Sequence, residues 1–243
     1  MRPLGRRVPP DRQHVERFAL ADIGLAVPPW GVEKGLGLPW WWKQHDQGAE
    51  GSCVGFGCSA MMSITNARQR WLRDKTAEAF RYDARWLYQE AQLVDDWDDT
   101  PPEEGTSVRA GCDILRLDGH RRIRFGVESD PDPAQGIAAN RWATTVDDVR
   151  AAIYANLAVA IGVDWYSNFD DPELYFGELW IGRRVLGHIR GGHCVCLYRM
   201  SDRRHAFRVM NSWGAGYPPV WLPYDVLERL LDDNGEAAVI TDR

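Results

Sequence analysis

The sequence has little lysine and an excess of acidic over basic residues. Its 29 basic residues include only three lysines, at positions 34, 43 and 75, against 35 acidic residues, so the net charge is −6. This preference for arginine is typical of a GC-rich coding sequence and indicates a bacterial or bacteriophage source. No run of Lys and Arg is present that could release counterions from a phosphate backbone. We therefore expect no nucleic-acid partner.

Long apolar runs and a regular cysteine pattern are also missing. The longest uninterrupted apolar stretch, Leu157 to Val163, is far short of the ~20 residues that cross a bilayer. Residues 1–10 carry charges but are not followed by the apolar region of a signal peptide. The five cysteines lack the spacing of a disulfide framework or a zinc site. We therefore expect a cytoplasmic protein with a free thiol, no metal, no cofactor and no membrane partner.

The composition is that of a compact soluble protein, with 44% apolar and 26% charged residues in 243 positions. Residues 1–30, rich in Arg and Pro, predict an extended N-terminal arm lying on the outside. The remaining domain, 31–243, divides into a helical half (31–142) and a β-rich half (143–243), which is an α+β fold. The core is expected to begin at residues 38–42.

Periodicity and capping residues place the elements. Helices are expected from Ser52 or Cys53, over Tyr82–Val94, from Thr106 or Ser107 to Leu117, and over Val146–Ala155 after the capping residue Thr145. Strands are expected over Ala158–Trp165, His193–Arg199, Ala206–Met210 and Ala237–Thr241. The acidic run 95–99 lacks the Gly and the closing Glu of a calcium loop, so we interpret it as a solvated loop.

Cys53 is the candidate nucleophile, because it follows a Gly-Ser turn and opens a helix. A helix N-terminus favours the thiolate and should pull the thiol pKa below about 8.5. Gln47, six positions earlier, can fold back beside the same helix end. Its amide and the backbone N–H of Cys53 could then form an oxyanion hole. Taken alone, Cys53 reads more readily as a small buried hydrophobic residue, as we expect for Cys58, and only its partners favour the nucleophile.

His193 is the best candidate to pair with such a thiol, since it begins a strand after two glycines that let a substrate backbone pass close by. The other histidines, at 14, 45, 120, 188 and 205, lie in polar or loop contexts typical of the surface, although His45 is near Cys53 in sequence. Asn211, at the end of a strand, can accept the second imidazole N–H. Trp213 can cover that hydrogen bond and keep water away.

Together these residues resemble the papain-like cysteine peptidase family. Gln47, the Gly-Ser-Cys ending at Cys53, the Gly-His ending at His193 and Asn-Ser-Trp-Gly from Asn211 occur in the family's order, separated by 140 and 18 residues between Cys, His and Asn. The likeness spans about residues 38–241, and Asp-Gln-Gly at 46–48 is similar to the bacterial branch. Glu50 stands where many members have a disulfide cysteine, and Val54 replaces a usual aromatic residue.

The resemblance implies a helical subdomain carrying the nucleophile, a β-rich subdomain carrying His and Asn, and a cleft between them. It implies that Cys53 attacks a peptide carbonyl, His193 protonates the amine and Gln47 stabilises the oxyanion. Substrate-binding positions would be Gly105, Gly162, Gly191, Gly192 and Trp213. Because the segment before Gln47 is short for an inhibitory propeptide, we expect activity without cleavage.

Two alternatives stay open. An amine could replace water in resolving the thioester, which would make a peptide ligase or transferase on the same site. The cleft could also be vestigial in an inactive peptide-binding protein, although all four chemical positions are present. The partner in each case is a peptide or protein, and the sequence leaves the oligomeric state open.

Overall fold

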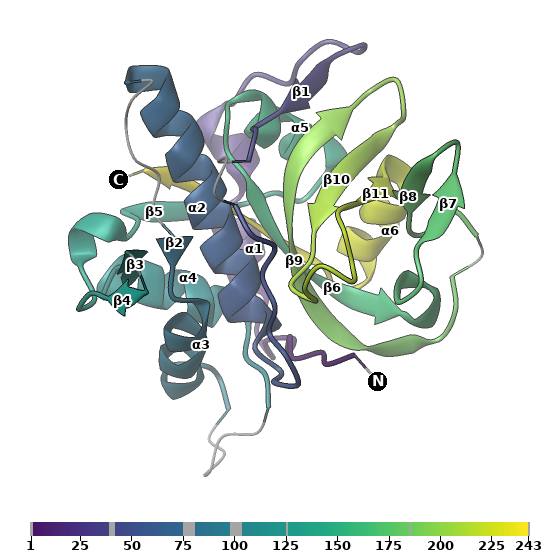
Figure 1. The fold of residues 1–243 in the computed structure, drawn as a ribbon. Helices are drawn as coiled ribbons and strands as arrows, with labels where there is room; N and C mark the ends of the chain where they lie inside the picture. The colour runs from purple at the N-terminus through teal and green to yellow at the C-terminus, as the bar shows by residue number, and fades with distance from the viewer. Residues whose placement is uncertain are drawn as a thin grey trace.

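The structure is a computed structural model that describes residues 2–38, 42–74, 81–97, 104–124, 126–184 and 186–242. Three helices that follow the N-terminal arm pack on one side of the molecule, and a large sheet forms the other side (Figure 1). This arrangement confirms the predicted α+β class. The expected start of the core at 38–42 and the acidic run 95–99 lie partly outside the described residues.

The helical side consists of α2 (Cys53–Arg73), α3 (Ala84–Leu93) and α4 (Val108–Leu117), with a small sheet of β2 (Arg81–Tyr82), β3 (Arg122–Arg124) and β4 (Val127–Glu128). The side chain of Asp83 caps α3 and that of Ser107 caps α4, each accepting hydrogen bonds from backbone N–H groups of the first turn. All three predicted helices are present. Tyr82 lies in β2, so α3 begins two residues later than expected.

The large sheet is centred on β6 (Val159–Tyr166) and β9 (Ile189–Ser201), which pair antiparallel. Its strand order is β5 (Ala139–Trp142), β12 (Glu236–Asp242), β6, β9, β10 (Ala206–Met210), β11 (Val220–Pro223), β8 (Glu178–Trp180) and β7 (Glu173–Tyr175), while β1 (Glu33–Gly35) also pairs with β9. The four predicted strands are β6, β9, β10 and β12. The capping box at Thr145 opens α5 (Val146–Tyr154), as expected.

Sequence reasoning missed α6 (Tyr224–Asp233) and several short strands. Among them, β5 lies within the half expected to be helical, yet it pairs with β12 in the large sheet. The division of the domain near residue 142 stays a prediction.

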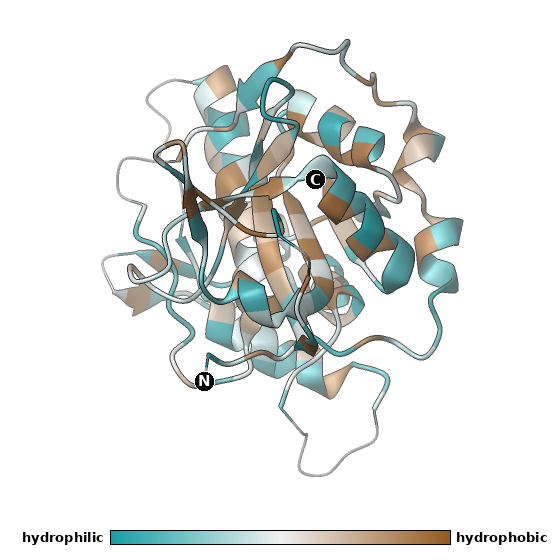
Figure 2. Ribbon diagram, turned by 90° about the vertical axis from the view of Figure 1, so that its right-hand side faces the viewer, coloured by the Kyte–Doolittle hydropathy of each residue, from teal (hydrophilic) through white to brown (hydrophobic). Residues whose placement is uncertain are grey.

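The core lies between α2 and the sheet. Residues 53–66 of α2 are all buried, as is nearly all of β6. Figure 2 shows the hydrophobic residues concentrated on the central strands. Gly57 permits the close approach of α2 to β9, because a Cβ there would lie 2.5 Å from the Sγ of Cys194. The helix that begins at Cys53 is therefore fixed directly against the strand that carries His193.

The N-terminal arm differs from its prediction in conformation and in place. It contains a short helix, α1 (Gln13–Arg17), and a 3-10 turn, η1 (Leu20–Ile23), so it is not extended throughout. Its first residues do not lie on the outside. They run between the helical side and the sheet, below the start of α2 in Figure 1, with backbone hydrogen bonds to Thr106 and Gly192.

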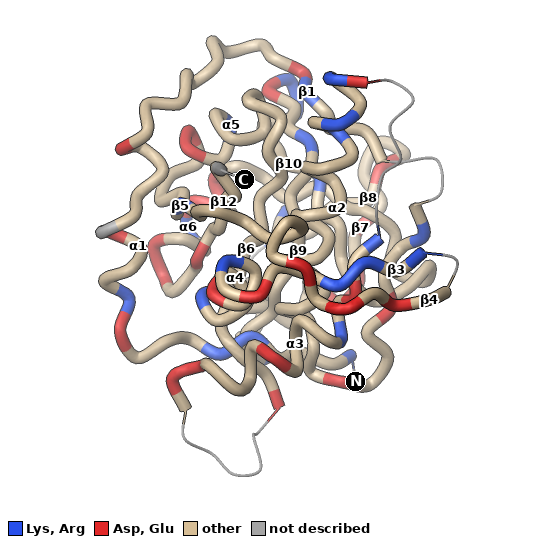
Figure 3. Tube along the Cα trace, turned by 90° about the vertical axis from the view of Figure 1, so that its left-hand side faces the viewer, with Lys and Arg blue, Asp and Glu red and all other residues tan. Residues whose placement is uncertain are grey.

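Charges of both signs are interspersed on the face shown in Figure 3. Over the described ranges, no helix is both long enough and apolar enough to pass through a bilayer.

Candidate active site

Cys53 lies at the N-terminal end of α2 and is fully buried. The backbone N–H of Cys194 points at its sulfur, with the nitrogen 3.4 Å from Sγ. Because Cys194 directly follows His193 in β9, this contact places His193 beside the thiol. The two residues are 140 positions apart in the sequence and meet where the helix abuts the sheet.

The second ring nitrogen of His193 is held by Asn211. His193 Nε2 lies 2.9 Å from Oδ1 of Asn211, at the end of β10. An amide oxygen only accepts hydrogen bonds, so Nε2 carries the proton and Nδ1 has the free lone pair. Nδ1 is buried and has no hydrogen-bond partner among the described residues. The lone pair of Nδ1 is therefore the basic position of this ring.

Two tryptophans enclose this imidazole. The ring of Trp213 stacks on it, with centroids 4.7 Å apart and planes inclined by 25°. Trp165, from β6, meets it edge-on at 4.7 Å. Together they shield the hydrogen bond between His193 and Asn211 from water, which strengthens it. Trp165 therefore shares the shielding that we expected from Trp213 alone, and the sequence did not indicate it.

Gln47 joins the same group through the residue after Asn211. Its backbone N–H donates to the carbonyl of Ser212 over 2.8 Å, and the Ser212 hydroxyl donates to Gln47 Oε1 over 2.6 Å. The amide nitrogen Nε2 donates one of its two hydrogens to the carbonyl of Glu50. The second hydrogen has a fixed direction, as an oxyanion donor requires. The structure thus brings together all four residues predicted for the chemistry.

The protonation states differ from the prediction. Burial raises the pKa of the Cys53 thiol to about 12, against the opposing pull of nearby backbone N–H groups and Arg6. Burial lowers the pKa of His193 to about 4, although its hydrogen bond to Asn211 opposes the shift. The expectation of a thiol pKa below 8.5 is wrong for this arrangement, because desolvation outweighs the helix N-terminus. Both groups are neutral at pH 7.

The arm is what covers these groups. The N–H groups of Gly5 and Arg6 donate to the carbonyl of Gly192, at 3.2 and 3.0 Å. On the other side, Thr106 donates to the carbonyl of Gly5 and accepts from the N–H of Arg7, so the arm pairs in parallel with this segment. The arm therefore runs between Thr106 on the helical side and Gly192 in the large sheet, with backbone hydrogen bonds to both.

All five positions predicted to bind substrate contact this arm. A Cβ on Gly105 or Gly192 would lie 2.4 or 2.1 Å from arm carbonyl oxygens. Gly162 lies under the side chain of Arg6, and Gly191 under that of Leu4. The indole Nε1 of Trp213 donates to the carbonyl of Pro3. The arm thus contacts each of these positions, and substrate binding by them stays a prediction.

Two residues that sequence reasoning did not single out form a buried ion pair between the arm and β12. The guanidinium of Arg6 is buried, with Nη2 3.2 Å from Oε2 of Glu236. In the sequence, the abundance of arginine indicates coding bias, and Glu236 only begins a strand. Neither Arg6 nor Glu236 belongs to a local motif. The two residues are 230 positions apart, and nothing in the sequence indicates that they contact each other.

Two histidines expected at the surface are buried instead. His45 stacks on Trp42, with centroids 5.0 Å apart, and packs edge-on against Phe56. His120 shares a hydrogen bond with Ser59, with Nε2 2.8 Å from Oγ, and stacks on Tyr82. Their surroundings are core aromatics, in contrast to the exposed positions of His188 and His205.

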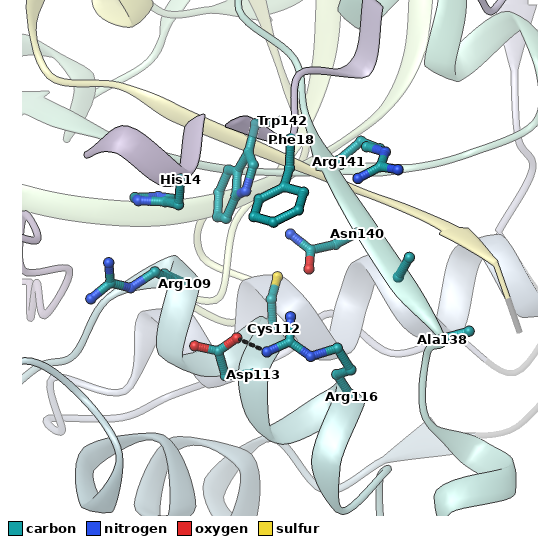
Figure 4. A pocket seen from close by; sticks show the side chains of 11 residues that line it. His14, Phe18, Arg109, Cys112, Asp113, Arg116, Ala138, Asn140, Arg141 and Trp142 are labelled. Atoms are coloured by element: carbon teal, nitrogen blue, oxygen red, sulfur yellow. Dashed lines mark hydrogen bonds and ion pairs between the residues drawn. The ribbon is translucent and has the colours of Figure 1, made fainter. Parts of the chain in front are cut away.

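A separate pocket of about 410 Å³ lies between α4, β5 and the arm (Figure 4). Its polar lining includes Arg109, Asn140 and the ion pair of Asp113 with Arg116. None of the four residues predicted for the chemistry lines it. In the described parts of the chain, no cluster of His, Cys, Asp and Glu is arranged to hold a metal ion.

The fold is similar to solved cysteine proteases over nearly its whole length. Xylellain, a cysteine protease from Xylella fastidiosa, matches with a TM-score of 0.68 and 19% identity over 100% of this chain and 97% of that one. Procathepsin L2, a digestive proteinase from the Tenebrio molitor larval midgut, matches with a TM-score of 0.63 and 16% identity over 99% and 78%. Procathepsin B S9 from Trypanosoma congolense matches with a TM-score of 0.60 and 13% identity over 99% of this chain and 87% of that one.

No known family profile matches the sequence, and no curated protein matches it. The structural likeness therefore defines the fold, which is that of the papain-like cysteine proteases.

Proposed function

We propose that this chain, with its papain-like fold, is a cysteine peptidase that hydrolyses peptide bonds through a thioester. The observation that supports it most is the arrangement of Cys53, His193 and Asn211. The thiol accepts the backbone N–H of the residue after His193, and the imidazole has one nitrogen fixed by Asn211 and the other free. A core histidine and a core cysteine would need no such arrangement.

The first chemical step follows from the tautomer of His193. Nδ1 takes the proton of the Cys53 thiol as the sulfur attacks the peptide carbonyl, which forms a tetrahedral adduct. The resulting imidazolium protonates the leaving amine, and the carbon–nitrogen bond breaks to leave the thioester. Asn211 keeps the proton on Nε2, so the basic nitrogen stays directed at the reaction throughout.

Water completes the cycle. His193 removes its proton as it attacks the thioester carbonyl, and the thiol leaves with that proton restored. In both steps the negative oxygen would lie against the free hydrogen of Gln47 Nε2 and the backbone N–H of Cys53. Preorganised donors of this kind contribute roughly 2.7–4 kcal/mol each.

The arm sets the resting state of this enzyme. Its strand covers the thiol, and burial keeps both Cys53 and His193 neutral. A peptide must therefore displace residues 3–7 before it can reach the sulfur. Once they leave, solvent enters the cleft, and the desolvation that raises the thiol pKa is relieved.

The test uses the full chain carrying Gly5→Ala, a substitution that should loosen the arm. We expect this variant to cleave internally quenched mixed-sequence peptides, and Cys53→Ala in the same background to lose all hydrolysis. Cys196→Ala, a matched change of another buried thiol, should retain it. Cleavage that persists in pure Cys53→Ala protein would contradict the proposal.

Mass spectrometry of the quenched reaction separates hydrolysis from transfer. A thioester on Cys53, followed by release of a free acid, supports the peptidase. With an amino-acid amide added, a predominantly amide product would instead indicate the ligase or transferase.

A further inference from the structure

Trp30 is an exposed indole on a segment that is anchored on both sides. The two residues before it accept hydrogen bonds from the buried Arg150 through their carbonyls, over 3.2 and 3.4 Å. The two residues after it donate their N–H groups to Asp202, over 3.0 and 2.9 Å. The indole itself is 62% exposed. The anchoring therefore keeps this ring at one place on the surface.

Two further aromatic rings lie beside Trp30. His205, in the turn that joins β9 to β10, has its ring centroid 5.6 Å from that of the indole. Tyr224, the first residue of α6, has its centroid 6.2 Å from the indole and 6.3 Å from the imidazole. Three separate segments of the chain thus supply one cluster of three rings.

His205 joins this cluster in an unfavourable backbone conformation. Its φ is 49°, in the left-handed region. Glycine ordinarily fills such a position at the end of a turn between two strands, because a Cβ is unfavourable there. The turn is closed by backbone hydrogen bonds, from the N–H of His205 to Asp202 and from the N–H of Tyr224 to His205. Glycine could form all of them, so what the histidine adds is its ring.

The three rings border an open pocket between α5, α6 and this turn. Its volume is about 640 Å³, which is within the range of small-molecule sites. Three carboxylates line it, those of Asp147, Asp225 and Glu228, and all three residues are exposed. Among the described residues that line the pocket, there is no Lys or Arg. The pocket therefore combines aromatic surface with negative charge.

One side of the indole already holds a cation that belongs to the protein. The guanidinium of Arg150 lies over the ring of Trp30, 4.0 Å from its centroid. Its charge is balanced by Asp202 and Asp147, at 2.9 and 2.7 Å. Because Arg150 is buried, the exposed surface of the indole lies on its other side. That side is open to a second cation.

The pocket is remote from the cleft. His193 lies near the start of β9, whereas His205 follows the end of that strand. Eight residue steps separate His193 from Ser201, the last residue of β9, and a strand of that length spans roughly 25 Å. None of the residues predicted for the chemistry lines this pocket. Binding here is therefore independent of the proposed peptidase activity.

The chemistry of the pocket favours one class of ligand. An aromatic face attracts a cation through its quadrupole, and nearby carboxylates attract it over longer distances. Alkyl groups on the cation bury apolar surface against the rings. The hydroxyl of Tyr224 already donates to Asp202, over 3.0 Å, so it does not compete for the ligand as a donor. An anion would be repelled by the three carboxylates.

We propose that this pocket is a second binding site, which recognises an organic cation with an alkylated ammonium group. Trp30 supplies the central aromatic surface, and Asp225 and Glu228 supply the charge. The same chemistry is found on a methylated lysine side chain of a polypeptide and on a free quaternary amine.

The test titrates the full chain with choline and with 3,3-dimethylbutan-1-ol, in which carbon replaces the ammonium nitrogen. The two probes have the same shape and differ in charge. Isothermal titration calorimetry is run at pH 8, where an imidazole is ordinarily neutral. We expect saturable binding of choline with a Kd at least tenfold lower than that of the alcohol. Equal Kd values, or no binding of choline, would overturn the proposal.

Trp30→Leu removes the central ring and should weaken choline binding at least fivefold. Trp71→Leu is the matched control, since Trp71 is also exposed and also has an arginine guanidinium over its ring, that of Arg68 at 4.9 Å. This control should bind choline as the unmodified chain does. An unchanged Kd in Trp30→Leu would show that choline binds elsewhere, and the assignment of the pocket would be wrong.

A second variant removes the charge and keeps the rings. Asp225→Asn combined with Glu228→Gln should raise the Kd of choline at least threefold and leave that of the alcohol unchanged. Asp232→Asn, at an exposed position of the same helix that does not line the pocket, is the control and should have no effect. Equal effects of the two variants would contradict recognition by the carboxylates.

The source of the cation is identified by a peptide with a central trimethyllysine. Tighter binding of this peptide than of choline would support the site and indicate a polypeptide ligand. Weaker binding would support the site and indicate a free amine. In both cases Trp30→Leu should weaken the binding of both probes, and peptide binding that is unchanged in this variant would count against the pocket.

Discussion

The indole ring of Trp213 lies nearly parallel to the imidazole of His193, with their centroids 4.7 Å apart. Beneath this cover, the hydrogen bond from His193 Nε2 to Asn211 Oδ1 is buried. The stack and the hydrogen bond fix two different properties of the imidazole, the plane of its ring and the position of its proton. Each can be removed separately.

Asn211→Ala should weaken catalysis without abolishing it. The variant leaves Nδ1 in place but releases the proton and the ring orientation, so we expect kcat to fall roughly 10- to 100-fold. His193→Ala removes the base itself and should reduce kcat by roughly 10³-fold or more. The two are compared by peptide hydrolysis in the Gly5→Ala background. Equal losses would show that Asn211 does more than orient the imidazole.

Gly5→Ala should increase activity, because the arm has no room for a side chain at this position. A Cβ on Gly5 would lie 1.7 Å from the carbonyl oxygen of Gly51, so the backbone must move out of the cleft. We expect kcat/KM to rise about tenfold or more over the unmodified chain, which corresponds to roughly 1.4 kcal/mol of lost competition.

Gly216→Ala is the control for that change, since a Cβ there meets nothing within 4 Å. Its kcat/KM should equal that of the unmodified chain. An unchanged rate in Gly5→Ala would mean that the arm does not obstruct the substrate.

Thiol labelling should depend on the arm in the same way. All five cysteines are buried and free, and burial raises the pKa of Cys53 to about 12. Iodoacetamide at pH 7 should therefore label the unmodified chain slowly, because the thiolate is the reactive form. In Gly5→Ala, one thiol should react quickly, and peptide mapping should identify it as Cys53. Fast labelling of Cys58 or Cys112 would contradict the site.

The chemical residues could be predicted because each belongs to a local pattern. Cys53 opens a helix after a Gly-Ser turn, and His193 follows two glycines at a strand. Asn211 ends a strand whose alternation was visible in the sequence. Such signals need only a few neighbouring positions, and it is their joint order, which resembles that of the papain-like family, that predicts the set.

The place of the arm could not be predicted, because its partners are remote and mostly backbone. The backbone N–H groups of Gly5 and Arg6 donate to the carbonyl of Gly192. No pattern of side chains in the sequence indicates a backbone hydrogen bond between residues so far apart. The prediction of a lowered pKa for the Cys53 thiol was wrong for the same reason, because it assumed that solvent reaches the sulfur. Desolvation depends on what covers the sulfur, which only the tertiary structure supplies.

A buried ion pair outside the cleft should dominate the stability of the sheet side. Asp202 binds Arg150 with both oxygens, at 3.1 and 2.9 Å, and both side chains are buried. Asp202→Ala removes the buried partner and leaves the buried guanidinium with only the exposed carboxylate of Asp147, so it should lower the free energy of unfolding by about 3–5 kcal/mol. Asp147→Ala removes the exposed partner of the same arginine, and should cost about 1 kcal/mol or less. Urea denaturation measures both, and equal losses would contradict the argument from burial.

Acid should destabilise the fold through its buried neutral histidines. Burial lowers the pKa of His45 to about 4, and Arg81 acts in the same direction. In the unfolded chain the same ring titrates near pH 6.5. Between these values the unfolded state binds a proton that the folded state does not. The free energy of unfolding therefore falls as pH drops, by about 2 kcal/mol from pH 7 to pH 5 for this one group.

His45→Phe should remove that contribution while keeping an aromatic ring between Trp42 and Phe56. The loss of stability between pH 7 and pH 5, measured by urea denaturation at both values, should shrink by about 2 kcal/mol. It should not vanish, because burial holds the pKa of His193 at about 4 as well. His188→Phe, at an exposed position, should leave the difference unchanged. If His45→Phe lost as much stability on acidification as the unmodified chain, His45 would not be buried in its neutral form.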